Sequence, residues 1–164
     1  MATPIKLLFL CTGNSCRSII AEALANHLGG GRIRAASAGS RPSGQVHPRA
    51  LAVLERHGIP VGEPSSKSMD DLEGEHFDAI VTVCDAAAGE SCPVWLADTA
   101  KSHWGIPDPA IAEGNDAAID AVFEATYERL RGRIEDLVAL DLEDLNALGL
   151  TASLQKIHRS HGEH

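Results

Sequence analysis

The chain has 164 residues, of which 44% are hydrophobic and 4% aromatic, and its formal net charge is −9. This length suits a single domain spanning 1–164 with an aliphatic core. The negative charge argues against a nucleic acid or an anionic membrane as partner, and we expect neither. No apolar run is long enough to cross a bilayer and no signal peptide is recognisable, so we expect a cytoplasmic protein.

The four cysteines do not fit a secreted disulfide scaffold, because such scaffolds are small and cysteine-dense. Four residues separate Cys11 from Cys16, and seven separate Cys84 from Cys92. Neither interval forms the paired knuckles of a structural zinc site, so we predict no metal held by these thiols. Catalytic or redox-active cysteines are the favoured interpretation.

The first predicted strand, residues 5–10, is apolar apart from Lys6 and leads directly into an eight-residue polar loop. A helix is predicted over about 17–28, because apolar residues recur at helical spacing until three consecutive glycines, residues 29–31. A loop between a buried strand and a helix start can turn its backbone N–H groups inward, and the helix adds a positive partial charge. This segment therefore predicts a cradle for a tetrahedral oxyanion.

Cys11 lies at the base of this cradle, where the helix start and the loop amides favour its thiolate, the nucleophilic form. Arg17 can offer a bidentate fork to two oxygens of the anion, and Ser18 can donate to the thiolate. The plainer alternative is a structural cysteine with a solvated arginine. The oxyanion-binding residues expected here are Thr12, Gly13, Asn14, Ser15, Cys16, Arg17 and Ser18.

The rest of the chain alternates predicted strands and helices. Strands are expected at 32–37, 77–83 and, more weakly, 101–106; helices at 46–57, 68–72 and from about 115 onward. The tail from about 141 is predicted as a helical extension made of two short helices, 142–148 and 151–158, divided by Gly149. This alternation predicts an α/β fold with a four-stranded parallel sheet flanked by helices on both faces.

Chemistry-bearing residues follow each predicted strand. Cys11 follows the first, Ser37 closes the second, Cys84 follows the third and Asp108 follows the fourth. Ligands of parallel sheets bind at the carboxyl ends of the strands. We therefore expect these four residues at one edge of the sheet.

The loop 11–18, followed by Ala21-Glu22, resembles the signature of the low-molecular-weight protein tyrosine phosphatases and of the arsenate reductases that share their fold. The segments 37–39 and 108–109 also match that superfamily. The resemblance covers about residues 5–140 and implies its flavodoxin-like, three-layer architecture.

Cys84 and Cys92 favour the reductase branch, because they stand where arsenate reductases carry a redox pair. The stretch His103-Trp104-Gly105 also resembles the reductases, whereas Ala110-Ile111 replaces the tyrosine pair usual in the phosphatases. The alternatives left open are a phosphatase hydrolysing aryl phosphate esters and a non-catalytic oxyanion sensor.

The resemblance implies a thiol relay. Cys11 attacks arsenate, a mimic of phosphate and sulfate, while Asp108 protonates the leaving oxygen and Arg17 stabilises the charge. Cys84 then attacks Cys11 and arsenite leaves, and Cys92 attacks Cys84 so that an external thiol donor can reduce the final disulfide. Thioredoxin is favoured as donor over a glutaredoxin or a low-molecular-weight thiol.

Two further features come from the resemblance. Cys16 either protects Cys11 from over-oxidation by pairing with it or only packs in the loop. No tightly bound cofactor is expected apart from a potassium ion, for which the candidate ligands are Asn14, Glu22, Ser37 and Asp70.

Overall fold

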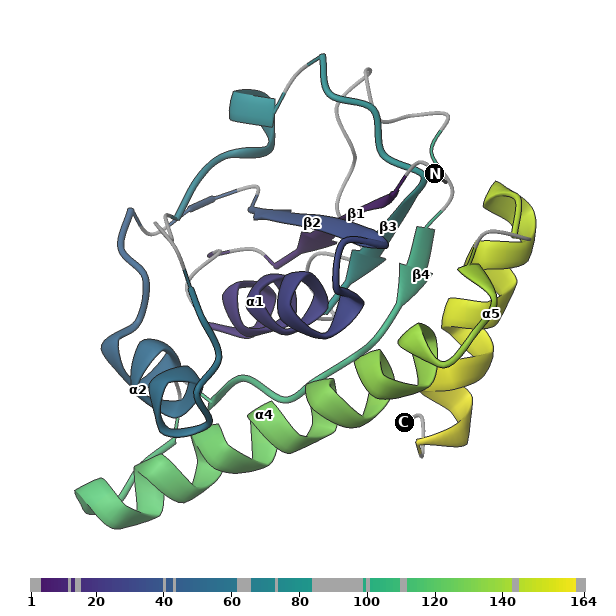
Figure 1. The fold of residues 1–164 in the computed structure, drawn as a ribbon. Helices are drawn as coiled ribbons and strands as arrows, with labels where there is room; N and C mark the ends of the chain where they lie inside the picture. The colour runs from purple at the N-terminus through teal and green to yellow at the C-terminus, as the bar shows by residue number, and fades with distance from the viewer. Residues whose placement is uncertain are drawn as a thin grey trace.

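The computed structural model describes residues 4–11, 13, 16–39, 41–42, 44–61, 66–72, 74–83, 99, 101–109, 112–142 and 145–161. Four strands form one sheet in the order β2-β1-β3-β4, with helices packed around it (Figure 1). Across these residues, no helix combines the length and the apolar character needed to span a bilayer.

All three strand pairings are parallel, as predicted. β1 (Ile5–Leu10) pairs along its full length with β2 (Ile33–Ala38), and on its other side with β3 (Ala79–Thr82). The edge strand β4 (Lys101–His103) pairs with β3. Parallel pairing brings the carboxyl ends of the four strands to the same edge of the sheet, where the candidate site lies.

The continuous apolar run of β1 is explained by burial on both faces of the sheet. Leu7 and Phe9 belong to a large core shared with the α-helices, whereas Leu8 and Leu10 belong to a second, smaller core. Successive side chains of a strand point to opposite faces, so the two cores lie on opposite sides. The 3-10 helix η1 (Met69–Leu72) contributes to the smaller core.

The helix α1 (Arg17–Gly29) lies between the sheet and the long helix α4 (Asp116–Val138) in Figure 1. It ends where Gly30 adopts a left-handed conformation with φ of 55°, which glycine adopts without steric cost. The helix α2 (Pro48–Arg56) is shorter than predicted because the His47 side chain caps it, accepting a hydrogen bond from the backbone of Arg49.

Two strands are also shorter than the sequence predicts. β3 starts at Ala79, and the preceding Asp78 bonds to the backbone of Lys6 through both its amide and its carboxylate. β4 ends at His103, and the chain continues irregularly with the Trp104 indole donating to the carbonyl of Leu154. Backbone hydrogen bonds to the neighbouring strand nevertheless continue just outside both limits, from Asp78 to Lys6 and from Trp104 to Thr82.

The tail forms one helix, α5 (Ala147–Ser160), so the predicted division at Gly149 is wrong. The Asn146 side chain caps this helix by accepting a hydrogen bond from the Gly149 amide at 2.7 Å, which places the glycine in the first turn. Figure 1 shows α5 beside β4, and its residues Leu150 and Leu154 are buried in the larger core.

Candidate active site

Cys11 is buried at the carboxyl end of β1. Its backbone amide donates to the carbonyl of Ala38 at the end of β2, at 3.2 Å. On the other side, the Val83 amide donates to the carbonyl of Leu10 at 2.9 Å, and the Ile106 amide donates to the carbonyl of Val83 at 3.1 Å. The chain segments that leave all four strands therefore meet around this cysteine, as the alternating pattern predicts.

The loop after Cys11 leads to the start of α1. Cys16 is buried in the N-cap position of that helix, Arg17 is its first residue, and Ser18 is fully buried. The carbonyl of Gly13 accepts a hydrogen bond from the Ser66 hydroxyl at 3.0 Å, which ties the loop to the segment before η1. Three of the predicted oxyanion ligands, Thr12, Asn14 and Ser15, lie outside the described residues.

The Arg17 guanidinium joins α1 to the segment after β4. Its Nη1 donates to the carbonyl of Ile106 at 2.9 Å, and its Nη2 lies 3.6 Å from Oδ2 of Asp108. Its Nε is buried and finds no hydrogen-bond partner within the described part of the chain. A buried donor without a partner is costly, and an oxyanion in the predicted cradle would satisfy it.

Asp108 is about one-third exposed, in contrast to the mostly buried Arg17. It lies five positions after the end of β4, and its contact with Arg17 brings it to the edge that carries Cys11. A carboxyl group at this edge and open to solvent is suited to exchange protons with a bound anion and with water. The structure thus brings together three of the predicted catalytic residues: Cys11, Arg17 and Asp108.

The other two predicted catalytic residues, Cys84 and Cys92, lie outside the described residues. The described chain reaches as far as Val83, which is buried and bonded to Leu10. Cys84 is the next residue in the sequence.

Two of the four candidate potassium ligands come together between α1 and β2. Burial raises the pKa of the Glu22 carboxyl, an effect opposed by nearby Lys67 and by the side chain and backbone of Ser37. The buried Ser37 hydroxyl faces this carboxyl group but makes no hydrogen bond of standard geometry to any described residue. Asp70 is exposed in η1, two residues after Ser68, which forms a bridge with Gly39, and Asn14 is not described.

Two site contacts could not be found from the sequence. The carbonyl of Ile106 holds Arg17, and the hydroxyl of Ser66 holds Gly13. A backbone carbonyl carries no residue-specific signal, and Ser66 stands 53 positions away from the loop it contacts. Both contacts depend on the packing of distant segments.

Known proteins resemble this chain over most of its length. The family model described as low molecular weight phosphotyrosine protein phosphatase matches residues 6–149. An arsenate reductase of Halalkalibacterium halodurans is 38% identical over 127 residues, covering 77% of this chain and 90% of that protein. A glutaredoxin arsenate reductase of Synechocystis sp. is 31% identical over 134 residues, covering 82% and 96%.

Solved structures that resemble this chain include further proteins described as arsenate reductases. An arsenate reductase in the phosphate binding state superposes with a TM-score of 0.66 at 31% identity, covering 82% of this chain and 97% of that one. A thioredoxin-dependent arsenate reductase of Corynebacterium glutamicum gives a TM-score of 0.62 at 26% identity, covering 85% and 64%. With the family model matching 6–149, this chain belongs to the low molecular weight phosphotyrosine protein phosphatase family.

Proposed function

We propose that this protein reduces arsenate to arsenite in the cytoplasm, as part of arsenic detoxification. The observation that carries the proposal is the buried Nε of Arg17, which has no hydrogen-bond partner among the described residues. It lies at the start of α1, six positions after the buried Cys11. An anion of phosphate shape would accept its hydrogen bond. The naming of the similar proteins as arsenate reductases supports arsenate as that anion.

The first step is nucleophilic attack by Cys11. Its thiolate forms an S–As bond, and the arsenic loses one oxygen, which leaves as water after protonation by Asp108. Arg17 and the loop amides stabilise the charge on the remaining oxygens. The contact of Arg17 with both Ile106 and Asp108 supports this division of roles, because it holds cation and acid at one edge of the sheet.

The second step is reduction. The Cys84 thiolate attacks the sulfur of Cys11, the S–As bond breaks, and its electron pair stays with arsenic, which leaves as arsenite. Cys92 then attacks Cys84, which frees Cys11 and leaves a disulfide between Cys84 and Cys92. The hydrogen bond of Val83 to Leu10 supports the relay, because it joins the residue before Cys84 to the residue before Cys11.

The experiment couples arsenate to NADPH oxidation through thioredoxin and thioredoxin reductase. Cys11→Ser abolishes turnover of arsenate and of an aryl phosphate, since both need the nucleophile. Cys84→Ser loses arsenate turnover but keeps slow aryl phosphate hydrolysis, since hydrolysis needs no second thiol. Arsenate turnover that survives in Cys84→Ser would contradict the relay, and phosphatase activity without any arsenate turnover would favour an ester hydrolase.

Thioredoxin is the proposed electron donor. A relay of three thiols ends in a disulfide between two protein cysteines, which a dithiol protein reduces by exchange. The similar Corynebacterium protein is described as thioredoxin-dependent, whereas the Synechocystis relative is described as a glutaredoxin arsenate reductase. Replacing thioredoxin and its reductase with glutaredoxin, glutathione and glutathione reductase tests which donor the protein uses. Faster arsenate turnover with the glutaredoxin system would show that glutaredoxin, not thioredoxin, is the donor.

We also propose a potassium ion bound by Glu22 and Ser37, with Asn14 and Asp70 as the further candidates. The partly buried Glu22 carboxyl faces the Ser37 hydroxyl, which makes no hydrogen bond of standard geometry within the described ranges. The two groups supply oxygen donors of the kind that a hard cation binds. Replacing choline chloride with potassium chloride should raise the melting temperature of the wild type but not of Glu22→Gln. An equal response of the two proteins would contradict this site.

A further inference from the structure

Four carboxylates follow one another at four-residue intervals along α4: Asp116, Asp120, Glu124 and Glu128. The first two pair with Arg49, at 2.7 and 2.5 Å. The third pairs with Arg56 at 3.4 Å and with His57 at 2.5 Å. Like charges four residues apart on a helix repel each other, and two arginines of α2 offset this repulsion at three of the four positions.

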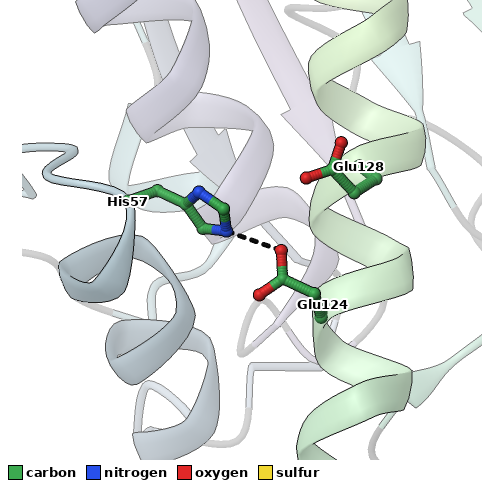
Figure 2. Close-up of side chains that lie close together, drawn as sticks. All are labelled: His57, Glu124 and Glu128. Carbon is green, nitrogen blue, oxygen red and sulfur yellow. Dashed lines mark hydrogen bonds and ion pairs between the residues drawn. The ribbon is translucent and has the colours of Figure 1, made fainter.

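Glu128 ends this row and differs from the other three. No ion pair or hydrogen bond to its carboxylate is formed by any residue within the described ranges. Yet its carboxylate lies near the imidazole of His57 and the carboxylate of Glu124 (Figure 2). The place that a cation would occupy therefore already has an imidazole nitrogen and two carboxylates around it.

The imidazole of His57 is held in a fixed orientation. The residue is the C-cap of α2, and its ring stacks on the fully buried Tyr127 with centroids 3.9 Å apart and planes inclined by 11°. Figure 2 shows the ring nitrogen directed at Glu124. Because the stacking already restricts the ring, a ligand bound there would cost little further side-chain entropy.

The geometry points to a binding site for a divalent transition-metal ion, with zinc as the best fit, formed by His57, Glu124 and Glu128. The three ligand atoms lie within 4.8 Å of one another, and tetrahedral zinc at ordinary bond lengths needs them about 3.3 Å apart. Binding would therefore require side-chain rotations that open the 2.5 Å contact between His57 and Glu124. An imidazole with two carboxylates suits zinc, whereas magnesium and calcium prefer oxygen ligands alone.

Such an ion would connect α2 with α4, on a different part of the molecule from Cys11 and Arg17. It would take the place of the contact between His57 and Glu124 and would also neutralise Glu128. The variant that separates a metal site from a simple ion pair is Glu128→Gln. It removes one metal ligand while leaving the pair between His57 and Glu124 in place.

Carbethoxylation of histidines, mapped by mass spectrometry of peptides, tests this site directly. The protein is first treated with iodoacetamide so that its cysteines do not bind the metal, and zinc chloride is then titrated. Zinc should protect His57 from modification, and Glu128→Gln should raise the zinc concentration for half-protection by about tenfold or more. His76 is the matched control, because it pairs with Asp78 at 3.3 Å without belonging to such a cluster of described residues.

Three results would overturn the assignment. These are the absence of His57 protection up to millimolar zinc, equal protection in Glu128→Gln, and equal protection by magnesium chloride. Thermal melting of Glu128→Gln, followed by circular dichroism, should show that this exposed substitution leaves the fold intact. Its weaker protection by zinc then reports the loss of a metal ligand.

Discussion

Arg17 has three donor nitrogens, and two of them contact described residues. Nη1 donates to the carbonyl of Ile106 and Nη2 lies near Asp108, whereas the buried Nε has no partner within the described ranges and is the proposed donor to the substrate anion. A lysine has one compact ammonium group and cannot make these contacts together. We expect Arg17→Lys to lower kcat/KM for arsenate by about a hundredfold or more, measured by arsenite production, since single oxyanion donors contribute on this scale.

The matched control is Arg34→Lys, which makes the same change at an exposed position near the opposite end of the sheet. It should leave kcat/KM unchanged. A kcat/KM of Arg17→Lys within about threefold of the wild-type value would show that the paired nitrogens of the guanidinium do not bind the anion.

The Glu22 carboxyl group makes the free energy of unfolding depend on pH. Burial raises the pKa of its carboxyl group, so the folded protein favours the neutral form. The stability that this neutral form contributes is fully present below the pKa of the unfolded chain and is lost as pH rises through the higher folded pKa. We expect Glu22→Gln to become progressively more stable than the wild type as pH rises from about 4 to about 8 in potassium-free buffer.

Urea unfolding at each pH measures this difference. The exposed Glu113→Gln is the control and should track the wild type across the range. A Glu22→Gln advantage that shrinks as pH rises would mean that the charged carboxylate is the form that the fold stabilises.

The loop residues show how far a sequence can predict a site. The positions of Cys11 and Arg17, after a buried strand and at the start of a helix, were predictable because their spacing is typical of an oxyanion-binding loop. The sequence predicts Cys11 and Asp108 at one sheet edge, but the pairing of Arg17 with Asp108 is a finding of the structure. The bond from Arg17 to the Ile106 carbonyl does not follow, since any residue at position 106 offers the same acceptor.

At the scale of elements, α5 completes the edge of the sheet. The Ser102 hydroxyl donates to the carbonyl of Thr151, and the His103 amide donates to the Gln155 side chain at 3.1 Å. An edge strand with free backbone groups invites pairing with other chains, and α5 satisfies such a donor on β4. The helix therefore stabilises the edge through hydrogen bonds as well as through its apolar face.

Because α5 stabilises the edge of the sheet, shortening a side chain on its buried face should lower the free energy of unfolding. Leu154 is fully buried, so Leu154→Ala should lower the free energy of unfolding by about 2–5 kcal/mol. Leu148 on the same helix is 78% exposed, and Leu148→Ala should change the free energy of unfolding by less than about 0.5 kcal/mol. Urea denaturation measures both, and equal effects would mean that α5 does not pack as described.

The limits of elements were less predictable than their existence. The helical periodicity before and after Gly149 is genuine, but a glycine alone does not show whether a helix ends or begins there. The Asn146 cap, three residues earlier, decides that the helix begins. The exact limits of β3 and β4 likewise depend on tertiary contacts, such as those of Asp78 and Trp104, which periodicity does not encode.

At the scale of the whole molecule, the net charge of −9 opposes the approach of an anionic substrate, while Arg17 attracts it at close range. Salt separates the two effects. The Debye length falls from about 30 Å at 0.01 M to about 8 Å at 0.15 M, so salt screens the long-range repulsion far more than the contact with Arg17. We expect KM for arsenate to fall over this range of sodium chloride, by less than about tenfold, with kcat unchanged.

Steady-state kinetics at constant pH measures this change in KM. Sodium sulfate is the contrasting salt, because sulfate competes with arsenate for the predicted oxyanion cradle. A KM that rises with sodium chloride would mean that local attraction outweighs the acidic surface.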